Sequence, residues 1–169
     1  MTESSSAPSA PPDVGAPLGH LPVLITRLDE GLPLPSYAHH GDAGADLYSR
    51  IDATIAPHGR LTIPTGVAIA IPDGYVGLVH PRSGLAAQRG LTVLNAPGTV
   101  DAGYRGEIAV TLINTDPSHE AHVARGDRIA QIVFQACERA RLIEVELLPI
   151  SHRGTSGFGS TGGWKEDGR

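Results

Sequence analysis

Short stretches in which apolar and polar residues alternate run through most of the chain. Apolar residues recur there at every second position, which is the spacing of side chains on one face of a β-strand. The stretches are residues 21–28, 66–72, 107–114, 128–134 and 141–148. The pattern predicts a strand at each of them. The segment from Cys137 to Leu148 is also compatible with a helix, because periodicity alone does not separate the two.

One short helix is expected, over residues 83–89. The sequence SGLAAQR contains good helix formers and is followed by Gly90, a residue typical of helix ends. Elsewhere the 21 Gly and 14 Pro divide the chain into short pieces separated by turns. Many short strands with frequent turns predict an all-β fold of the jelly-roll, sandwich or barrel kind, with one short helix.

Composition divides the chain into three parts. Residues 1–20 are rich in Ser, Pro and Ala and hold too few large apolar side chains to offset the entropy of ordering, which predicts a disordered tail. Residues 21–150 carry the strand pattern and are expected to form the β domain. Residues 151–169 are glycine-rich, yet they include an arginine, a phenylalanine and hydroxyl side chains, a composition typical of a mobile arm that orders on a ligand.

Charge and cysteine content narrow the functional classes. The net charge of -5 argues against a general nucleic-acid binder, which carries a basic excess. Cys137 is the single cysteine, so an intrachain disulfide is excluded, and we expect it to be a small buried apolar residue. The sequence has no signal-peptide pattern and no apolar run of membrane-spanning length. A cytoplasmic protein without membrane partners is therefore the expectation.

Two segments place polar side chains around turns. NAPGTVDAGYRGEI, from Asn95, brings Asn95, Asp101 and Tyr104 around one excursion between strands. PRSGLA, from Pro81, combines Arg82 and Ser83 with the start of the predicted helix, where cations and backbone N–H groups hold anions. By themselves the first is compatible with an ordinary turn and the second with a helix capped by Ser83.

Three further segments complete the candidate chemistry. GDAGADLYS carries Asp42 and Asp46, carboxylates of the kind that Mg²⁺ uses together with water and phosphate oxygens, or it is an Asp-rich turn. In RGDRIAQ, residues 125–131, the Arg-Asp pairs are expected to be structural salt links, and Gln131 is the better ligand candidate. RGTSGFGSTGG, residues 153–163, is not a Walker loop because no Gly-Lys-Ser/Thr follows its glycines. We expect residues from Trp164 onward to be a disordered end.

In this order, the five segments closely resemble the motifs of the trimeric deoxyuridine triphosphate nucleotidohydrolase (dUTPase) family. The resemblance extends from Asp42 to Gly163 and rests on the conjunction of DAGADLYS, PRSGLA, NAPGTVDAGYRGEI, RGDRIAQ and RGTSGFGSTGG. It implies a jelly-roll-like β-barrel or sandwich, assembled as a homotrimer. It also implies the hydrolysis of dUTP to dUMP and pyrophosphate by water attack on the α-phosphorus, which lowers dUTP and supplies dUMP for thymidylate synthesis.

The resemblance also implies a role for individual residues. Asp101 would deprotonate the attacking water, Asp46 would bind Mg²⁺ through water, and the C-terminal arm would close the site of a neighbouring subunit, with Phe158 stacking on the uracil. Tyr104 would lie under the deoxyribose and exclude a 2′-hydroxyl. The implied substrate-binding residues are Arg82, Ser83, Gly84, Asn95, Thr99, Val100, Asp101, Tyr104, Gln131, Arg153, Phe158, Gly159, Ser160 and Thr161.

Other functions are weighed against this one. A dCTP deaminase of related fold would need a carboxylate on the strand after the hairpin, where this chain has Thr111. A regulatory nucleotide-binding module would have lost the catalytic Asp or the arm, and a purely structural β-assembly would leave the clustered Arg and Asp segments unexplained. The pairs His39-His40 and His119/His122 lack zinc-ligand spacing and are expected to be surface or core histidines.

Overall fold

The computed structural model describes residues 20–151, which fall in two units, Met1–Arg139 and Ala140–Arg169. The predicted tail up to residue 19, and the arm from residue 152 onward, lie outside the described residues. Within residues 20–139 the chain forms ten strands and one helix. They are β1 (Leu24–Arg27), β2 (Ala45–Tyr48), β3 (Ala53–Ile55), β4 (Arg60–Ala70), β5 (Tyr75–His80), α1 (Ser83–Arg89), β6 (Leu91–Val93), β7 (Gly98–Val100), β8 (Glu107–Asn114), β9 (Ala121–Val123) and β10 (Arg128–Ala136).

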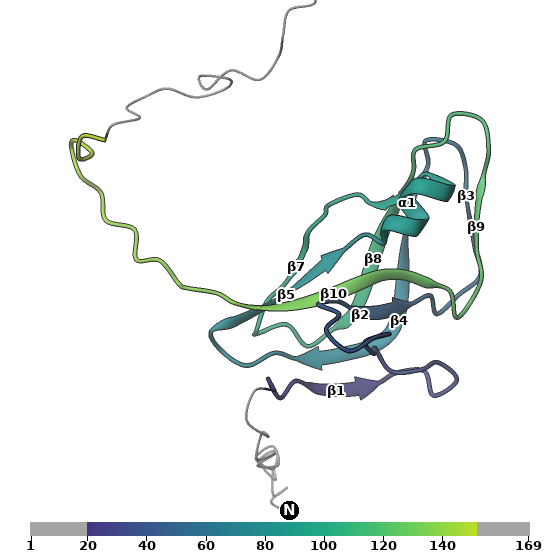
Figure 1. The fold of residues 1–169 in the computed structure, drawn as a ribbon, viewed down its shortest axis with the longest axis horizontal. Coiled ribbons are helices and arrows are strands. Elements are labelled where there is room, and N and C mark those ends of the chain that lie inside the picture. The colour runs from purple at the N-terminus through teal and green to yellow at the C-terminus, as the bar shows by residue number, and fades with distance from the viewer. Residues whose placement is uncertain (1–19, 152–169) are drawn as a thin grey trace, which may run out of the picture. The chain divides into compact units, whose positions relative to one another are not determined.

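The strands form two four-stranded sheets and a small two-stranded one. The first sheet has the order β1-β4-β8-β6, the second β2-β10-β5-β7, and β3 pairs with β9. Every pairing is antiparallel. Figure 1 shows β10 crossing the domain beside β2 and β5, and α1 leads directly into β6. This architecture confirms the all-β prediction with one short helix.

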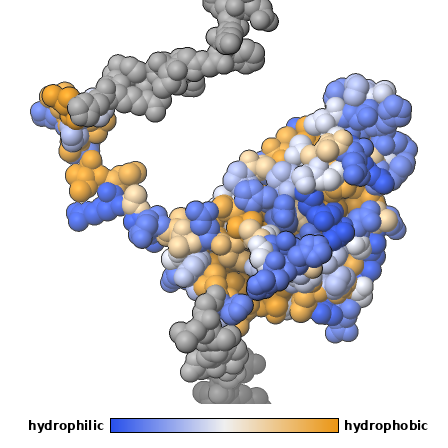
Figure 2. Space-filling model, viewed as in Figure 1, coloured by the Kyte–Doolittle hydropathy of each residue, from blue (hydrophilic) through white to orange (hydrophobic). Residues whose placement is uncertain are grey.

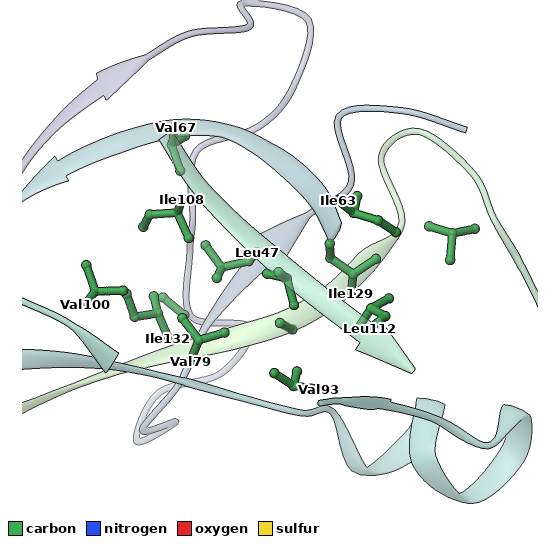
Figure 3. Close-up of a cluster of buried hydrophobic side chains, with 14 of the residues drawn as sticks. Leu47, Ile63, Val67, Val79, Val93, Val100, Ile108, Leu112, Ile129 and Ile132 are labelled. Carbon is green, nitrogen blue, oxygen red and sulfur yellow. The ribbon is translucent and has the colours of Figure 1, made fainter. Parts of the chain in front are cut away.

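The core is made of aliphatic side chains from both large sheets. In β4, Val67 and Ile69 are buried together with Ile71 just beyond the strand, and β8 buries Ile108 and Val110 in the same alternating way. Figure 3 shows such side chains from β2, β4, β5, β8 and β10 converging on one cluster. Burial of this alternating set is the principal stabilising term of the domain. The predicted strand pattern is confirmed at these positions.

The helix begins at Ser83 and ends at Arg89, as the sequence predicts. Gly90 follows in the left-handed conformation, with φ of 61°, and its N–H donates to the carbonyl of Ala86. The helix cap, however, is Arg82, whose backbone is extended, and no side chain caps the helix. The alternative in which Ser83 is the N-cap is therefore wrong. Ser83 is the first helical residue, and its hydroxyl is left available to a ligand.

Two predictions near the end of β10 are wrong. Residues 141–148 form neither a strand nor a helix, and Leu142 and Leu147 are 93% and 87% exposed. Their alternating pattern has no partner strand among residues 20–151, so nothing fixes an extended conformation. Cys137 is exposed rather than buried, because β10 ends at Ala136 and the chain there leaves the sheet.

Apolar surface is also visible on the folded domain. Figure 2 shows apolar residues between the hydrophilic ones on the viewed face. All four residues of β1 are exposed, including Leu24 and Ile25. Over residues 20–151, no helix is long and apolar enough to cross a membrane.

Candidate functional site

Strand register places three of the predicted motifs in one row. In the second sheet Gln131 of β10 lies opposite Asp46 of β2 on one side and opposite His80 of β5 on the other. Paired residues on neighbouring antiparallel strands lie about 5 Å apart, so their side chains are in reach of one another. Arg82 follows His80 by two residues, where β5 gives way to α1. Segments far apart in the sequence thus meet because of sheet pairing.

A buried carboxylate holds the arginines of this row. Asp46 is 7% exposed, and its Oδ1 lies 3.0 Å from Arg82 Nε, while its Oδ2 lies 3.2 Å from Arg128 Nη1. Arg82 also donates to the backbone carbonyl of Arg128 at 3.4 Å. A carboxylate this buried requires compensation, and two guanidinium groups supply it. In return the carboxylate restricts the orientation of both arginines.

Gln131 is fixed in the same place. Its Nε2 donates to the carbonyl of Pro81 at 3.0 Å, which leaves its Oε1 directed at Gly44. A Cβ built on Gly44 would lie 2.9 Å from Gln131 Cδ, so only glycine leaves this amide undisturbed. These residues line a hollow of about 580 Å³, named here the Arg82 hollow, with Asp46, Arg82, Arg128 and Gln131 in its wall.

The other residues of PRSG lie beside it. Ser83 and Gly84 line an adjoining hollow of about 280 Å³ that shares Arg82 and Gln131 with the first. Both residues are exposed, and a Cβ on Gly84 would meet nothing within 4 Å. Arg82, Ser83, Gly84, Gln131 and Asp46 are therefore brought together, as the motifs predict.

The salt links of RGDRIAQ differ in detail from the prediction. Arg125 pairs with Asp29 at 2.6 Å and Arg128 with Asp46, so each arginine binds an aspartate outside its own segment. Asp127 instead accepts the N–H of Ala124 at 2.9 Å, within a turn. Arg128 consequently belongs to the wall of the Arg82 hollow. The sequence alone did not single it out as a ligand.

The hairpin residues form a second hollow of about 230 Å³, named here the Tyr104 hollow. It is lined by Thr99, Val100, Asp101, Tyr104, Glu107, Ile108 and Ala109. Asp101 is exposed, and its carboxylate makes no hydrogen bond or ion pair with any other residue of the described range 20–151. The Tyr104 hydroxyl donates to the carbonyl of Glu107 at 2.9 Å. A free carboxylate thus lies beside an anchored aromatic ring.

Asn95 lies at the other end of β7, in the turn between β6 and β7. It is exposed, and its amide makes no hydrogen bond to another residue in the described part of the chain. Gly98, buried three residues later, leaves room for that amide: a Cβ there would lie 3.4 Å from Asn95 Nδ2. The polar groups of Asn95 are available for an external partner.

Within one chain, the Arg82 hollow and the Tyr104 hollow are separate. The Arg82 hollow and the Tyr104 hollow share no lining residue. Register explains the separation, because Val100 pairs with Gly77 of β5, and Arg82 is five residues beyond Gly77. Asp101, the next residue, continues that register opposite Val76, six residues before Arg82, and a rise of about 3.3 Å per residue then separates the two by roughly 20 Å along the sheet. Within one chain, Asp101 and Arg82 therefore line separate hollows.

Several predicted or rejected residues are also located. Arg153, Phe158, Gly159, Ser160 and Thr161 lie outside the described residues. Thr111, where a deaminase would need its carboxylate, shares a hydrogen bond of 2.9 Å with Thr62 on the neighbouring strand β4.

Gly106 and Glu107 contact Tyr104, and Arg50 pairs with Glu107, but sequence reasoning missed all three. Gly106 and Glu107 follow Tyr104 within the hairpin motif, which was the available signal. Arg50 lies 57 residues away from Glu107 and carries no local signal.

Charged groups away from the hollows have shifted pKa values. Burial of Asp29 would raise the pKa of its carboxyl, but the Gly31 N–H and the cations of Arg125 and Arg50 outweigh that effect and lower it. The Asp116 pKa is lowered to about 2 because its carboxylate accepts the N–H groups of Ser118 and His119. His119 and His122 lie on the surface, where they contact Asp116 and Glu120 respectively.

Comparisons with known proteins agree with the five motifs. A family model described as dUTPase matches residues 30–162. A deoxyuridine 5′-triphosphate nucleotidohydrolase of Thermobifida fusca is 61% identical over 151 residues, covering 89% of this chain and 84% of that protein. One from Bifidobacterium longum subsp. infantis is 63% identical over 141 residues, covering 83% of this chain and 89% of that protein.

Solved structures show the same relationship in three dimensions. The dUTPase of Staphylococcus bacteriophage 80alpha with dUPNHPP has a TM-score of 0.77 at 28% identity, covering 83% of this chain and 98% of that one. A variant dUTPase from phage phi11 of S. aureus, described with a structural Mg(II) ion, has a TM-score of 0.70 at 26% identity, covering 75% and 97% of the two chains. By sequence, motif order and fold, the chain belongs to the dUTPase family of enzymes.

Proposed function

We propose that the chain hydrolyses dUTP to dUMP and pyrophosphate, by attack of water on the α-phosphorus. One observation carries this proposal: the dUTPase motifs are present in order, Asp46 and Gln131 lie opposite each other on paired strands, and Arg82 contacts Asp46. A row of one buried carboxylate, two arginines and an amide suits a polyanion. In a cell the reaction would lower dUTP and supply dUMP for thymidylate synthesis, and a cytoplasmic location stays a prediction.

Triphosphate binding would fall to the Arg82 hollow. Arg82 would neutralise phosphate oxygens, and Ser83, Gly84 and Gln131 would donate hydrogen bonds to them. The Asp46 carboxylate already holds Arg82 at 3.0 Å, so the cation is oriented before the substrate arrives. Pre-oriented donors lower the barrier to phosphoryl transfer because they need no reorganisation during the reaction.

The nucleoside would be recognised at the hairpin. The Asn95 amide, together with Thr99 and Val100, would pair with the polar edge of uracil, so that a cytosine would leave buried polar groups unpaired. The Tyr104 ring would lie under the deoxyribose. Asp101 would accept a proton from the attacking water, a role that suits a carboxylate with no hydrogen-bond partner among residues 20–151. A positioned base of this kind contributes roughly 10²–10⁴-fold to the rate.

The donor set at Asp46 fits Mg²⁺ held through water. A carboxylate has about four acceptor positions, and the two arginines occupy two of them. Mg²⁺ favours one or two carboxylates, several waters and substrate phosphates, and dispenses with an all-protein cage. No group of three or more His, Cys, Asp or Glu side chains that could hold a metal occurs over residues 20–151. Asp46 would thus hold the ion, and the bound ion would supply charge neutralisation on the phosphates.

The enzyme would work as a homotrimer in which each active site is completed by neighbouring subunits. Two observations support this part of the proposal. The Tyr104 and Arg82 hollows share no residue, so one chain alone lacks a complete site. Apolar side chains that a stable monomer would bury are exposed, among them Leu142, Leu147 and Leu148. The arm from residue 151 onward, with Arg153, Phe158, Gly159, Ser160 and Thr161, would close over a neighbour's nucleotide.

Product analysis tests the proposed reaction. In the presence of Mg²⁺, the full chain is incubated with one nucleotide at a time: dUTP, dTTP, dCTP, dATP, dGTP or UTP. The nucleotide products and pyrophosphate are then separated and identified. We expect dUMP and pyrophosphate from dUTP, with the other substrates turned over far more slowly. Ammonia and dUTP formed from dCTP would instead identify a deaminase. Tight dUTP binding with no product would identify a regulatory module.

A further inference from the structure

The Tyr104 ring is held by the two residues that follow the hairpin turn. Its hydroxyl donates to the carbonyl of Glu107 at 2.9 Å. The ring also lies over Gly106, so closely that a Cβ built on Gly106 would lie 2.7 Å from Tyr104 Cζ and closer still to its hydroxyl oxygen. Any side chain at 106 would therefore displace the ring. The position and tilt of the Tyr104 ring are therefore set by the glycine at position 106 and by the backbone carbonyl of Glu107.

The side chain of Glu107, whose carbonyl anchors Tyr104, is itself held by two other residues. The Glu107 carboxylate accepts the N–H of Gly66 at 2.8 Å and receives Arg50 Nη1 at 3.2 Å. Gly66 sits where the register of β4 and β8 shifts, between Pro64 and Ala68, and has a φ of +75°. A left-handed conformation of this kind favours glycine. The irregularity within β4 thus directs a backbone N–H at the Glu107 carboxylate.

Arg50 extends the attachment to a third segment. Its Nη2 donates to the carbonyl of Leu28 at 3.2 Å, and its Nε lies 3.5 Å from the Asp29 carboxylate. Arg125 holds the same aspartate at 2.6 Å. The cations that lower the Asp29 pKa therefore keep it charged and paired with Arg50. Glu107 is connected in this way to segments that do not touch the Tyr104 hollow.

We propose that Glu107 and Arg50 are positioning residues that fix the Tyr104 ring and thereby set the preference for deoxyribose over ribose. The inference rests on the proposed function, in which Tyr104 lies under the sugar. If the carboxylate of Glu107 is loosened, the start of β8 relaxes, and the carbonyl that anchors the Tyr104 hydroxyl moves with it. A ring that can tilt away leaves space for a 2′-hydroxyl, so discrimination against UTP falls.

Four variants separate this role from a general loss of stability. Glu107→Gln keeps the size of the side chain but removes its charge, and Arg50→Gln removes the cation. Gly106→Ala displaces the ring directly and is the positive control for the link between Tyr104 and the sugar. Glu120→Gln removes an exposed carboxylate that contacts His122 on the surface and is the matched negative control.

The deciding quantity is the ratio of kcat/KM for dUTP to kcat/KM for UTP. We expect Glu107→Gln, Arg50→Gln and Gly106→Ala to lower it by roughly tenfold or more, mainly through faster UTP hydrolysis relative to dUTP. Glu120→Gln should leave it unchanged. A merely destabilised enzyme loses both activities in proportion, so its ratio stays constant. A constant ratio in Glu107→Gln and Arg50→Gln, with a lowered ratio in Gly106→Ala, would overturn the positioning role alone.

A crystal structure of Glu107→Gln gives a readout that does not depend on turnover. We expect the contact between the Tyr104 hydroxyl and the carbonyl of residue 107 to be lost, or the ring to be rotated relative to the wild-type crystal. An unchanged ring would contradict the proposal. If the wild type fails to hydrolyse dUTP, the proposed function fails and the sugar preference fails with it, while this comparison still decides whether Glu107 positions Tyr104.

Discussion

The carboxylate of Asp46 lies 3.0 Å from the guanidinium of Arg82. This ion pair connects β2 to the segment between β5 and α1. Arg128 approaches the other carboxylate oxygen at 3.2 Å. Two cations around one anion leave the neighbourhood of Asp46 positively charged in the absence of ligand. The two arginines that flank Asp46 therefore oppose Mg²⁺ binding there until phosphates arrive.

Magnesium binding should consequently depend on the nucleotide. Titration of the protein with MgCl₂ alone, followed by calorimetry, should show no saturable binding at Asp46. With a non-hydrolysable dUTP analogue present, Mg²⁺ should bind, because the phosphates reverse the local charge and supply ligands.

Asp46→Asn is the matched variant for this prediction. It should weaken Mg²⁺ binding in the presence of the analogue, and it should lower the free energy of unfolding by about 1–2 kcal/mol, since two partly exposed arginines lose their partner. Saturable binding to the free wild type that disappears in Asp46→Asn would contradict the charge argument.

Gly44→Ala should lower activity through Gln131. A Cβ at position 44 would lie 2.9 Å from Gln131 Cδ, so the amide must leave its bond to the Pro81 carbonyl. We expect kcat/KM for dUTP to fall roughly tenfold, because one phosphate donor is misplaced. The free energy of unfolding should change by about 1 kcal/mol or less, since the displaced atoms are the end of a side chain.

A double-mutant cycle isolates this route. If Gly44→Ala acts only through the amide, combining it with Gln131→Ala should cost no more than Gln131→Ala alone. Additive losses would mean that Gly44 contributes in another way, and Gln131 would then not be the affected group.

Local patterns predicted the parts of the fold that depend on local chemistry. Alternation identified the buried faces of β4 and β8, and Gly90 marked the end of α1. The prediction of a strand over residues 141–148 was wrong, because an alternating segment forms a strand only when a partner covers its apolar face. The sequence of one chain does not show what that partner is. The same reason explains Cys137, whose neighbours resemble a buried strand although the sheet has already ended.

The site was predictable where one motif carried its own chemistry, as in the grouping of Arg82, Ser83 and Gly84. What could not be foreseen depends on pairing between distant segments. Arg128 faces Asp46 because β2 and β10 are adjacent. Arg50 reaches Glu107 because both bind the backbone of the irregular part of β4, at Pro64 and Gly66 respectively. Neither contact could be inferred from the spacing of residues along the sequence.

Acid should remove a defined part of the stability through Asp116. The folded-state pKa of this carboxyl is about 2, below its ordinary value of 3.8, because the N–H groups of Ser118 and His119 bind the charged form. Because the pKa is lower in the folded state, the ionised carboxylate stabilises the fold above pH 3.8. That stabilisation is lost as the pH falls toward 2. The difference in unfolding free energy between wild type and Asp116→Asn should therefore shrink over this range in urea titrations at fixed protein concentration.

The Asp101 carboxylate provides the sharpest test of the proposed chemistry. It is exposed in the Tyr104 hollow and has no side-chain partner over residues 20–151, so replacing it removes no contact of the fold. Asp101→Asn should keep the unfolding temperature and the affinity for a non-hydrolysable dUTP analogue, while kcat falls roughly 10²–10⁴-fold because the amide cannot accept the proton of water. Rapid-quench kinetics and calorimetry on the same preparation measure both quantities. If kcat survives, the base is a different group; if binding is lost together with kcat, Asp101 holds the nucleotide and does not activate water.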